Sequence, residues 1–205
     1  MSLIFYYSPQ SSAVTVHWAL EELGVPYEKV KIDLQARDQD KPAFLALNPN
    51  AKVPLVVHDG TPIFESVAII LHLGETFGEK KGLFPAPGLK RAEAFKWLVW
   101  TNVSLGEALS RFQHNSSERI PKERHNAKAA EVAKADVEKH LGILDAALAG
   151  KTWLVGESFS LIDVHVGGWA AYVGMVGFDT KRWPNLTAWL GRCTSRPGFA
   201  ASMAP

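Results

Sequence analysis

The sequence predicts an α/β fold joined to an all-α fold: an N-terminal domain with the element order βαβαββα, then a C-terminal domain built from helices alone. Three observations lead to this prediction. Short apolar runs typical of β-strands end before residue 79, helical patterns alternate with them up to that point, and only helical patterns follow residue 89. We therefore expect domains at 1–78 and 90–205, separated by a linker at 79–89.

The N-terminal half carries the signals of four strands and three helices. The strands are expected at 3–7, 27–33, 54–59 and 62–65, and the helices at 12–23, 42–47 and 66–77. Gly24 should end the first helix, because glycine readily adopts the left-handed conformation that closes helices. A helix between the first two strands predicts that these strands run parallel. Asp59 and Gly60, between the last two strands, predict a tight hairpin.

The second half opens with the linker and continues as helices. Segment 79–89, EKKGLFPAPGL, combines charge, glycine and two prolines, a composition typical of loops. Helices are expected at 90–115, 122–149, 160–176 and 184–195, with a short helical piece after Pro197. Residues that recur at helical spacing in the first of these helices predict a buried stripe of Ala94, Trp97, Leu98, Thr101 and Leu105.

The composition excludes several classes of protein. Apolar residues make up 47% of the chain, enough for a substantial core. Lys and Arg total 22 against 21 acidic residues, so we expect no nucleic acid and no membrane as a partner. No apolar run approaches the ~18 residues of a membrane span, and the N-terminus lacks an export signal. Cys193 is the only cysteine, which excludes a disulfide within the chain and favours a cytoplasmic location.

Several catalytic motifs are missing from the sequence. No histidine pair has the i, i+4 spacing of a zinc site, and no glycine-rich loop has the order that binds nucleotide phosphates. We therefore expect no metal, and we interpret His165 as a packed helix residue. Two helix starts stand out instead, Ser11-Ser12 and Glu65-Ser66. Either pair could cap its own helix or help to bind an anion.

Five segments in register resemble the cytosolic glutathione S-transferases, in particular the bacterial, beta-like and serine-type forms. The segments are YYSP at 6–9, ALEELGVPYE at 19–28, FLALNPNAKVP at 44–54, FESVAI at 64–69 and FSLIDV at 159–164. The resemblance covers nearly the whole chain. It implies a thioredoxin-like N-terminal domain that holds glutathione and a helical domain that supplies most of the second substrate's pocket. In FSLIDV, Ser160 and Asp163 resemble the family's capping box, with Phe159 packing on Val164.

The resemblance assigns glutathione-binding roles to five residues. The backbone of Val53 would pair with the cysteinyl unit of glutathione, and the peptide bond before Pro54 would be cis. Ser66 and the helix that follows would bind the γ-glutamyl carboxylate, while Glu65 would lie near its ammonium group. Lys52 would meet the glycyl carboxylate, or else be a solvated lysine.

The sulfur of the bound tripeptide would then lie over the start of the first helix. There a hydroxyl and the helix end would favour the thiolate over the thiol, so no general base is required. Ser12 occupies the place where beta-class members carry a cysteine, and Ser11 is its neighbour. The plant-type and zeta-type serine patterns place Gln10 at this point, and a slip of one residue restores Ser11. Both serines remain candidate catalytic residues, and the other one is expected to cap the helix.

The resemblance implies a homodimeric detoxification enzyme that joins the glutathione thiolate to a small, hydrophobic electrophile. The electrophile pocket is expected between the domains, and each lining residue could instead belong to the core or to a dimer surface. The expected lining residues are Trp100, Val103, Ser104, Phe112 and Trp169. Two alternatives stay open: a non-catalytic binding or interaction module, and a glutathione-dependent thiol transferase or peroxidase. The lack of cysteine in 6–24 argues against the second alternative.

Overall fold

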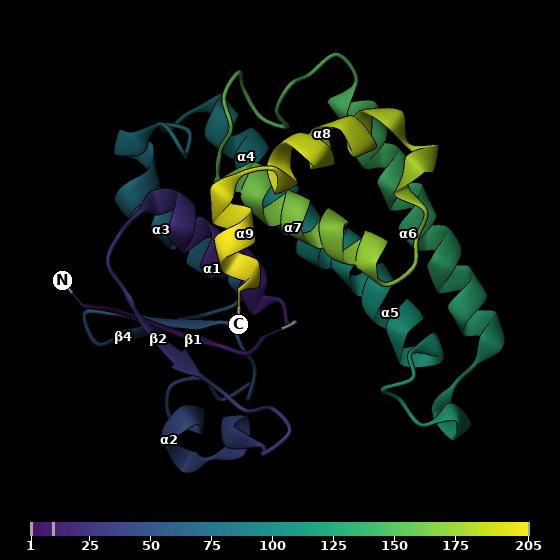
Figure 1. The fold of residues 1–205 in the computed structure, drawn as a ribbon, viewed down its shortest axis with the longest axis horizontal. Helices are drawn as coiled ribbons and strands as arrows, with labels where there is room; N and C mark the ends of the chain where they lie inside the picture. Colours follow the sequence, from purple (N-terminus) through teal and green to yellow (C-terminus); the bar gives the residue numbers. More distant parts are fainter. Residues whose placement is uncertain (1, 10, 205) are drawn as a thin grey trace. The chain divides into compact units, whose positions relative to one another are not determined.

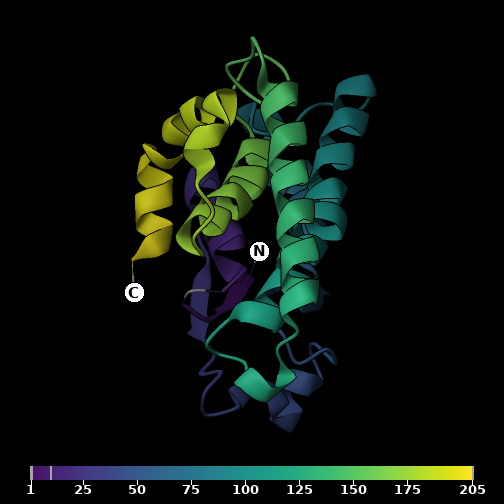
Figure 2. The same cartoon turned by 90° about the vertical axis from the view of Figure 1, so that its right-hand side faces the viewer.

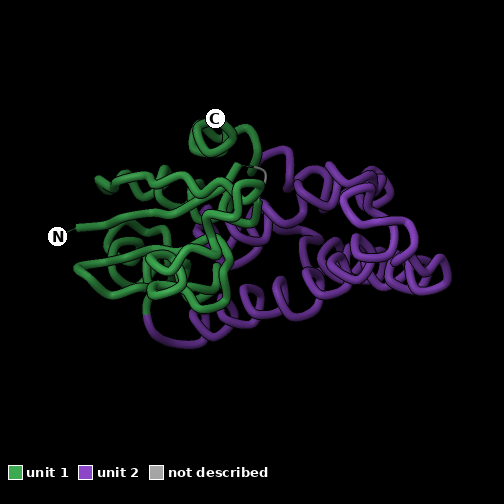
Figure 3. The backbone as a smooth tube through the Cα atoms, turned by 90° about the horizontal axis from the view of Figure 1, so that it is seen from below, with its two compact units in different colours: residues 1–86, 193–205 green, residues 87–192 purple. Residues whose placement is uncertain are grey.

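The computed structural model describes residues 2–9 and 11–204, and the chain divides into two compact units. Unit 1 comprises Met1–Ala86 together with Cys193–Pro205, and unit 2 comprises Pro87–Arg192 (Figure 3). The domain bounds expected from the sequence differ from these units chiefly at the C-terminal end, because the last residues of the chain pack with the N-terminal half.

Unit 1 contains a four-stranded mixed sheet in the order β2-β1-β3-β4. The strands are β1 (Leu3–Tyr7), β2 (Glu28–Lys31), β3 (Leu55–His58) and β4 (Thr61–Phe64). β1 and β2 are parallel, while β3 is antiparallel to both β1 and β4, so the predicted βαβαββα order is confirmed. The hairpin between β3 and β4 turns at Asp59 and Gly60, which both have positive φ angles (46° and 82°). This is the backbone geometry that an Asp-Gly pair supplies.

Helices cover both faces of this sheet. α1 (Ala13–Leu23), α3 (Ser66–Leu73) and α9 (Pro197–Met203) lie on one side, and the short α2 (Pro42–Leu45) lies on the other (Figure 1). Neighbouring strand residues point to opposite faces, so Phe5 packs near His17 of α1 while Tyr6 packs edge-on against Phe44 of α2. Gly24 ends α1 in the left-handed conformation (φ 56°), as predicted.

Specific contacts hold α9 against α1. Arg196 pairs with both carboxylate oxygens of Glu22, at 2.9 and 2.6 Å, and the indole of Trp18 donates to the same carboxylate at 3.0 Å. The Glu22 side chain is only 7% exposed. The rings of Trp18 and Phe199 meet edge to face at 5.0 Å, and His17 Nδ1 lies 3.2 Å from the Ser202 carbonyl oxygen. These contacts explain why residues 193–205 cluster with unit 1.

The segment expected to be a linker is partly folded. α3 continues into a π-helical turn, Gly74–Gly78, and a short 3-10 turn, Glu79–Lys81, follows. Phe84 is buried, and a Cβ atom added at Gly74 would overlap its ring. Residue 89 already begins the next helix, so loop structure is confined to 82–88, where Phe84 packs against Gly74 at the end of α3.

Unit 2 is helical. α4 (Leu89–Trp100) passes through a π-helical turn, Thr101–Gly106, into α5 (Glu107–Ser116), and α6 (Ala127–Leu148) runs beside α5 (Figures 1 and 2). α7 (Leu161–Met175) contacts α4, and α8 (Pro184–Thr194) follows it in the chain. The predicted stripe from Ala94 to Leu105 is confirmed, since all of its members are buried. Across residues 2–9 and 11–204, no helix combines the length and the apolarity that crossing a membrane requires.

The start of α7 has the predicted capping box. Asp163 is fully buried, and its carboxylate accepts hydrogen bonds from the Ser160 backbone and hydroxyl at 3.0 and 3.1 Å. The Leu154 backbone and the Trp189 indole donate to its other oxygen at 2.9 and 2.8 Å. The preceding helix, α6, begins later than the sequence predicts: it was expected from residue 122 and begins at Ala127. Asn126 caps it by accepting a hydrogen bond from the Ala129 N–H at 3.0 Å.

Candidate functional site

The register of the sheet gathers three chain segments at one end of unit 1. Leu55, the first residue of β3, lies opposite Tyr6 of β1 and also opposite Phe64 of β4. The residues just before β3, just after β1 and just after β4 therefore meet at the same edge. These are the segments in which the sequence places Ser11 and Ser12, Lys52 to Pro54, and Glu65 with Ser66.

The two serines before α1 make different hydrogen bonds. The Ser11 hydroxyl donates to the Ser8 carbonyl oxygen at 2.7 Å and accepts from the Ala13 N–H at 3.2 Å. Ser11 is thereby occupied within its own turn, where it satisfies one of the first N–H groups of the helix. Ser12 is exposed, and its side chain makes no capping bond. Gln10, the third position considered for this role, lies outside the described residues.

The Ser12 hydroxyl instead reaches across to the segment before β3. It donates to the Val53 carbonyl oxygen at 3.3 Å, which joins the start of α1 to a residue 41 positions away. The peptide bond between Val53 and Pro54 is cis, as predicted. Val53 and Pro54 are themselves buried, so what they offer at this edge is backbone.

The third segment is the start of α3. Glu65 has an uncommon backbone for a residue with a side chain (φ 70°, ψ 116°), and its own side chain is exposed. Strained backbone of this kind costs about 1–3 kcal/mol and tends to occur at binding sites. Ser66 is buried as the first residue of α3. The unpaired N–H groups and partial positive charge of a helix start are suited to a carboxylate.

The histidine ring within α1 is uncharged at physiological pH. His17, in the middle of α1, is buried, and burial lowers its pKa, with Lys29 acting in the same direction. His17 is therefore neutral at physiological pH. His17 therefore adds no positive charge to the start of α1, where the helix end itself carries a partial positive charge.

One residue of this edge is missing from the set that the sequence indicated. Asn48 is 1% exposed, and its amide donates to the Lys52 carbonyl oxygen at 2.7 Å. Its side-chain oxygen accepts from the Asn50 N–H at 3.0 Å. An asparagine before proline is a common turn signal, which could have drawn attention to this residue. Lys52 itself is exposed.

The five residues expected to line the electrophile pocket all belong to unit 2. Their contacts and exposure within this unit differ from one residue to the next. The Trp100 ring lies 5.2 Å from Trp97 and 5.6 Å from His140, and Phe112 lies 5.0 Å from Phe178. Trp169 packs against Gly106, where an added Cβ would lie 3.0 Å from its ring, and Ser104 is half-buried nearby in the π-helical turn. Val103 is 67% exposed. Their assignment to a pocket stays a prediction.

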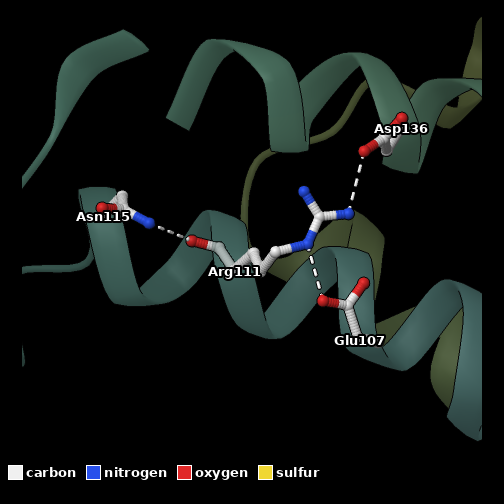
Figure 4. Close-up of polar contacts among 4 residues, drawn as sticks. All are labelled: Glu107, Arg111, Asn115 and Asp136. Atoms are coloured by element: carbon white, nitrogen blue, oxygen red, sulfur yellow. Dashed lines mark hydrogen bonds and ion pairs between the residues drawn. The ribbon is translucent and has the colours of Figure 1, made fainter. Parts of the chain in front are cut away.

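Unit 2 also contains a cavity of about 360 Å³ between α5 and α6. At its wall, Arg111 donates to Glu107 at 2.7 Å and to Asp136 at 2.8 Å, and Asn115 donates to the Arg111 carbonyl oxygen (Figure 4). These two carboxylates raise the pKa of Arg111, and its guanidinium lowers that of Asp136. The cavity lining is Arg111, Asn115, Asn126, Lys128, Ala129 and Val132. None of the residues singled out in the sequence lies here.

Neither unit shows a metal centre in the part of the chain that the structure describes. Among residues 2–9 and 11–204, no three or more His, Cys, Asp or Glu side chains converge as metal ligands. Cys193 is buried.

Comparison with known proteins finds the same family in both halves of the chain. The family model "Glutathione S-transferase, N-terminal domain" matches residues 1–75, and "Glutathione S-transferase, C-terminal domain" matches residues 107–197. The chain is 32% identical to "Glutathione S-transferase GstB" of Escherichia coli K12 over 180 residues, covering 87% of this chain and 86% of that protein. It is 30% identical over 209 residues to "Disulfide-bond oxidoreductase YfcG" of the same organism, covering 97% and 93%.

A solved structure extends the likeness to the whole fold. The glutathione S-transferase of a sphingomonad, complexed with glutathione, superposes with a TM-score of 0.85 at 30% sequence identity. The match covers 98% of this chain and 96% of that one.

Proposed function

Because this chain belongs to the glutathione S-transferase family, we propose that it binds glutathione at the edge formed by Ser12, Val53 and Ser66. It then joins the glutathione thiolate to a small, hydrophobic electrophile by substitution or addition at carbon. The observation that carries the proposal is the contact between the Ser12 hydroxyl and Val53, since it brings the candidate thiolate partner to the candidate peptide-binding backbone.

Ser12 is the better candidate for the thiolate partner. Its hydroxyl is exposed and held by one long hydrogen bond of 3.3 Å, so it can turn to a new acceptor at little cost. The Ser11 hydroxyl makes a shorter bond of 2.7 Å to Ser8 and also accepts from Ala13. We assign Ser11 to the helix start and Ser12 to the sulfur.

The energy that this assignment requires is modest. A free thiol has a pKa of about 8.5, and lowering it by two units requires about 2.7 kcal/mol. A hydrogen bond to a charged acceptor contributes about 1.5–3 kcal/mol, and a helix N-terminus about 0.3–1 kcal/mol. The Ser12 hydroxyl and the start of α1 together supply this amount. The thiolate then attacks the electrophile directly, so no further base takes part.

The remaining groups would fix the tripeptide. Ser66 and the start of α3 receive the γ-glutamyl carboxylate, and the exposed Glu65 side chain pairs with the ammonium group. The Val53 backbone pairs with the cysteinyl unit, and Lys52 meets the glycyl carboxylate. Support for these roles comes from the register, which brings all three segments to one edge of the sheet.

A second candidate function follows from one of the relatives. A protein of 30% identity is described as a disulfide-bond oxidoreductase, so reduction of disulfides by glutathione is the alternative reaction. Cys193 is buried, and replacing it with alanine should leave either activity unchanged. Turnover of a small disulfide against turnover of an activated aryl chloride, with glutathione in both assays, decides between the two reactions.

We also propose a homodimer in the cytoplasm. Dimers are usual for the family, and Val99 and Val103 expose apolar side chains one turn apart on unit 2. Light scattering should give a mass of twice 22.5 kDa, and a mass of 22.5 kDa would contradict the dimer. A single cysteine suits a reducing compartment.

Retention on immobilised glutathione tests the proposal. The wild-type protein should be retained and eluted by free glutathione, and Glu65→Ala should weaken retention strongly because the ammonium group loses its partner. Glu28→Ala, which removes an exposed carboxylate on β2, is the matched control and should behave as the wild type. A wild-type protein that passes through the column, with no turnover of either substrate, would overturn the proposed function in favour of a non-catalytic module.

A further inference from the structure

The peptide bond between Lys52 and Val53 is anchored on one side, while its other side has no hydrogen bond to a described residue. Its carbonyl oxygen accepts the 2.7 Å hydrogen bond from the Asn48 amide. No described residue accepts a hydrogen bond from the Val53 N–H on the opposite side of the same bond. In a planar trans peptide the C=O and N–H point in opposite directions. Fixing the carbonyl toward Asn48 therefore fixes the N–H in the direction away from it.

Asn48 is in turn held in place from three directions. Its backbone N–H donates to the Phe44 carbonyl oxygen of α2 at 2.9 Å, and Phe44 packs against Tyr6 of β1. The Ala51 N–H donates to the Asn48 carbonyl oxygen at 3.1 Å, and the Asn50 N–H donates to the Asn48 side chain at 3.0 Å. Asn48 thus connects the turn from 48 to 52 with the sheet: its buried side chain bonds to the turn, and its backbone bonds to Phe44, which packs on β1.

We propose that Asn48 is the positioning residue of the glutathione site: its side-chain amide holds the Lys52 carbonyl inward and so presents the Val53 N–H to the cysteinyl carbonyl of glutathione. This inference rests on the proposed function, and it assigns a role in binding the peptide part of the ligand rather than in ionising its sulfur. Ser12 donates to the Val53 carbonyl oxygen, and it remains the residue that we propose to stabilise the thiolate.

The test uses two variants that both remove the amide donor facing the Lys52 carbonyl. Asn48→Asp keeps the oxygen that accepts from the Asn50 N–H but replaces the amide donor with a second oxygen facing the Lys52 carbonyl. Asn48→Ser is a second variant, which removes the amide donor without introducing a charge. Asn50→Ala is the control, because Asn50 is exposed and takes part through its backbone alone. The measurements are the Kd for S-methylglutathione, which has no thiol to ionise, and the KM and kcat for glutathione.

Loss of one well-placed hydrogen bond predicts that Kd and KM rise roughly three- to tenfold in both Asn48 variants. The kcat at saturating glutathione and the pH midpoint of kcat should stay at the wild-type values, and Asn50→Ala should match the wild type throughout. A merely structural role would lower the thermal midpoint and the active fraction while leaving KM unchanged, and that result would overturn the inference. Failure of the wild-type protein itself to bind S-methylglutathione would instead contradict the proposed function.

Discussion

Two neighbouring serines at the start of α1 differ in the bonds that their hydroxyls make, and this difference supports the roles proposed for them. Ser11 is committed to its own turn through Ser8 and Ala13, whereas the exposed Ser12 touches Val53. The sequence indicated the pair but did not separate its members, because a count along the chain is uncertain by one residue. The direction of each hydroxyl depends on the turn that precedes the helix, which the sequence pattern does not specify.

Backbone conformation at a single residue gives the first prediction. Ala51 has a φ angle of 52°, a left-handed conformation that costs an alanine about 1 kcal/mol and a glycine almost nothing. Ala51→Gly should therefore raise the free energy of unfolding by up to about 1 kcal/mol, measured by urea denaturation. Ala46→Gly is the control: its φ angle is −63°, so the same change should destabilise the protein. A loss of stability in Ala51→Gly would contradict the assigned conformation.

At the scale of elements, the strands and most helices were predictable because each carries a local signal. Alternation of strand and helix patterns identified βαβαββα, Asp-Gly identified the hairpin, and the Ser160-Asp163 spacing identified the start of α7. The return of α9 to α1 was not predictable. It depends on Arg196 meeting Glu22, residues separated by 174 positions, and a sequence pattern gives no information about such a pairing.

The α1–α9 contact carries the second prediction. Arg196→Ala leaves the nearly buried Glu22 carboxylate with the Trp18 indole as its remaining donor among the bonds described above. Because a buried carboxylate that loses its cation is costly, we expect the free energy of unfolding to fall by about 2 kcal/mol. Arg37→Ala is the control, because it breaks an exposed ion pair with Asp40 in the same unit. It should change the free energy of unfolding by less than about 0.5 kcal/mol. Equal effects of the two substitutions in urea denaturation would show that the Glu22 pair is no more than a surface contact.

Across the whole molecule, buried and half-buried histidines should make stability depend on pH. Burial lowers the pKa of His17, His72 and His140, and it lowers that of the fully buried His165 from 6.5 to about 3. Below about pH 6.5 the unfolded chain binds protons that the folded protein does not. This stabilisation is therefore complete above that pH and is lost as the pH falls.

The third prediction puts a size on this effect. When the pH falls from about 7.5 to about 5.5, the free energy of unfolding should decrease by about 1 kcal/mol for each histidine that stays neutral in the folded state. Urea midpoints at the two pH values measure the change. His165→Gln removes one titrating group while keeping an amide that can face Asn102, the present partner of His165 at 2.8 Å, and should reduce the pH dependence. A His165→Gln protein with undiminished pH dependence would mean that His165 is protonated in the folded state.

The proposed glutathione site shows how much of such a site the sequence alone can indicate. Val53, Pro54, Glu65 and Ser66 were recognisable because their motif is local, and the sheet register brings them to one edge. Asn48 was not recognised, since the role proposed for it depends on the burial of its amide and on the direction of one peptide bond. The electrophile pocket, expected from residues of unit 2, depends on side-chain surroundings that spacing along a helix does not define.

The ionisation of glutathione on the protein tests the central claim most directly. The ultraviolet absorbance of the thiolate, followed against pH, gives the pKa of the bound thiol in the wild type, in Ser12→Ala and in Ser11→Ala. The wild type should hold this pKa about two units below that of free glutathione, and Ser12→Ala should raise it by about one unit or more, corresponding to the loss of about 1.5 kcal/mol. Ser11→Ala should shift it far less. If glutathione bound to Ser12→Ala ionises at the same pH as in the wild type, the hydroxyl of Ser12 does not stabilise the thiolate and the account is wrong.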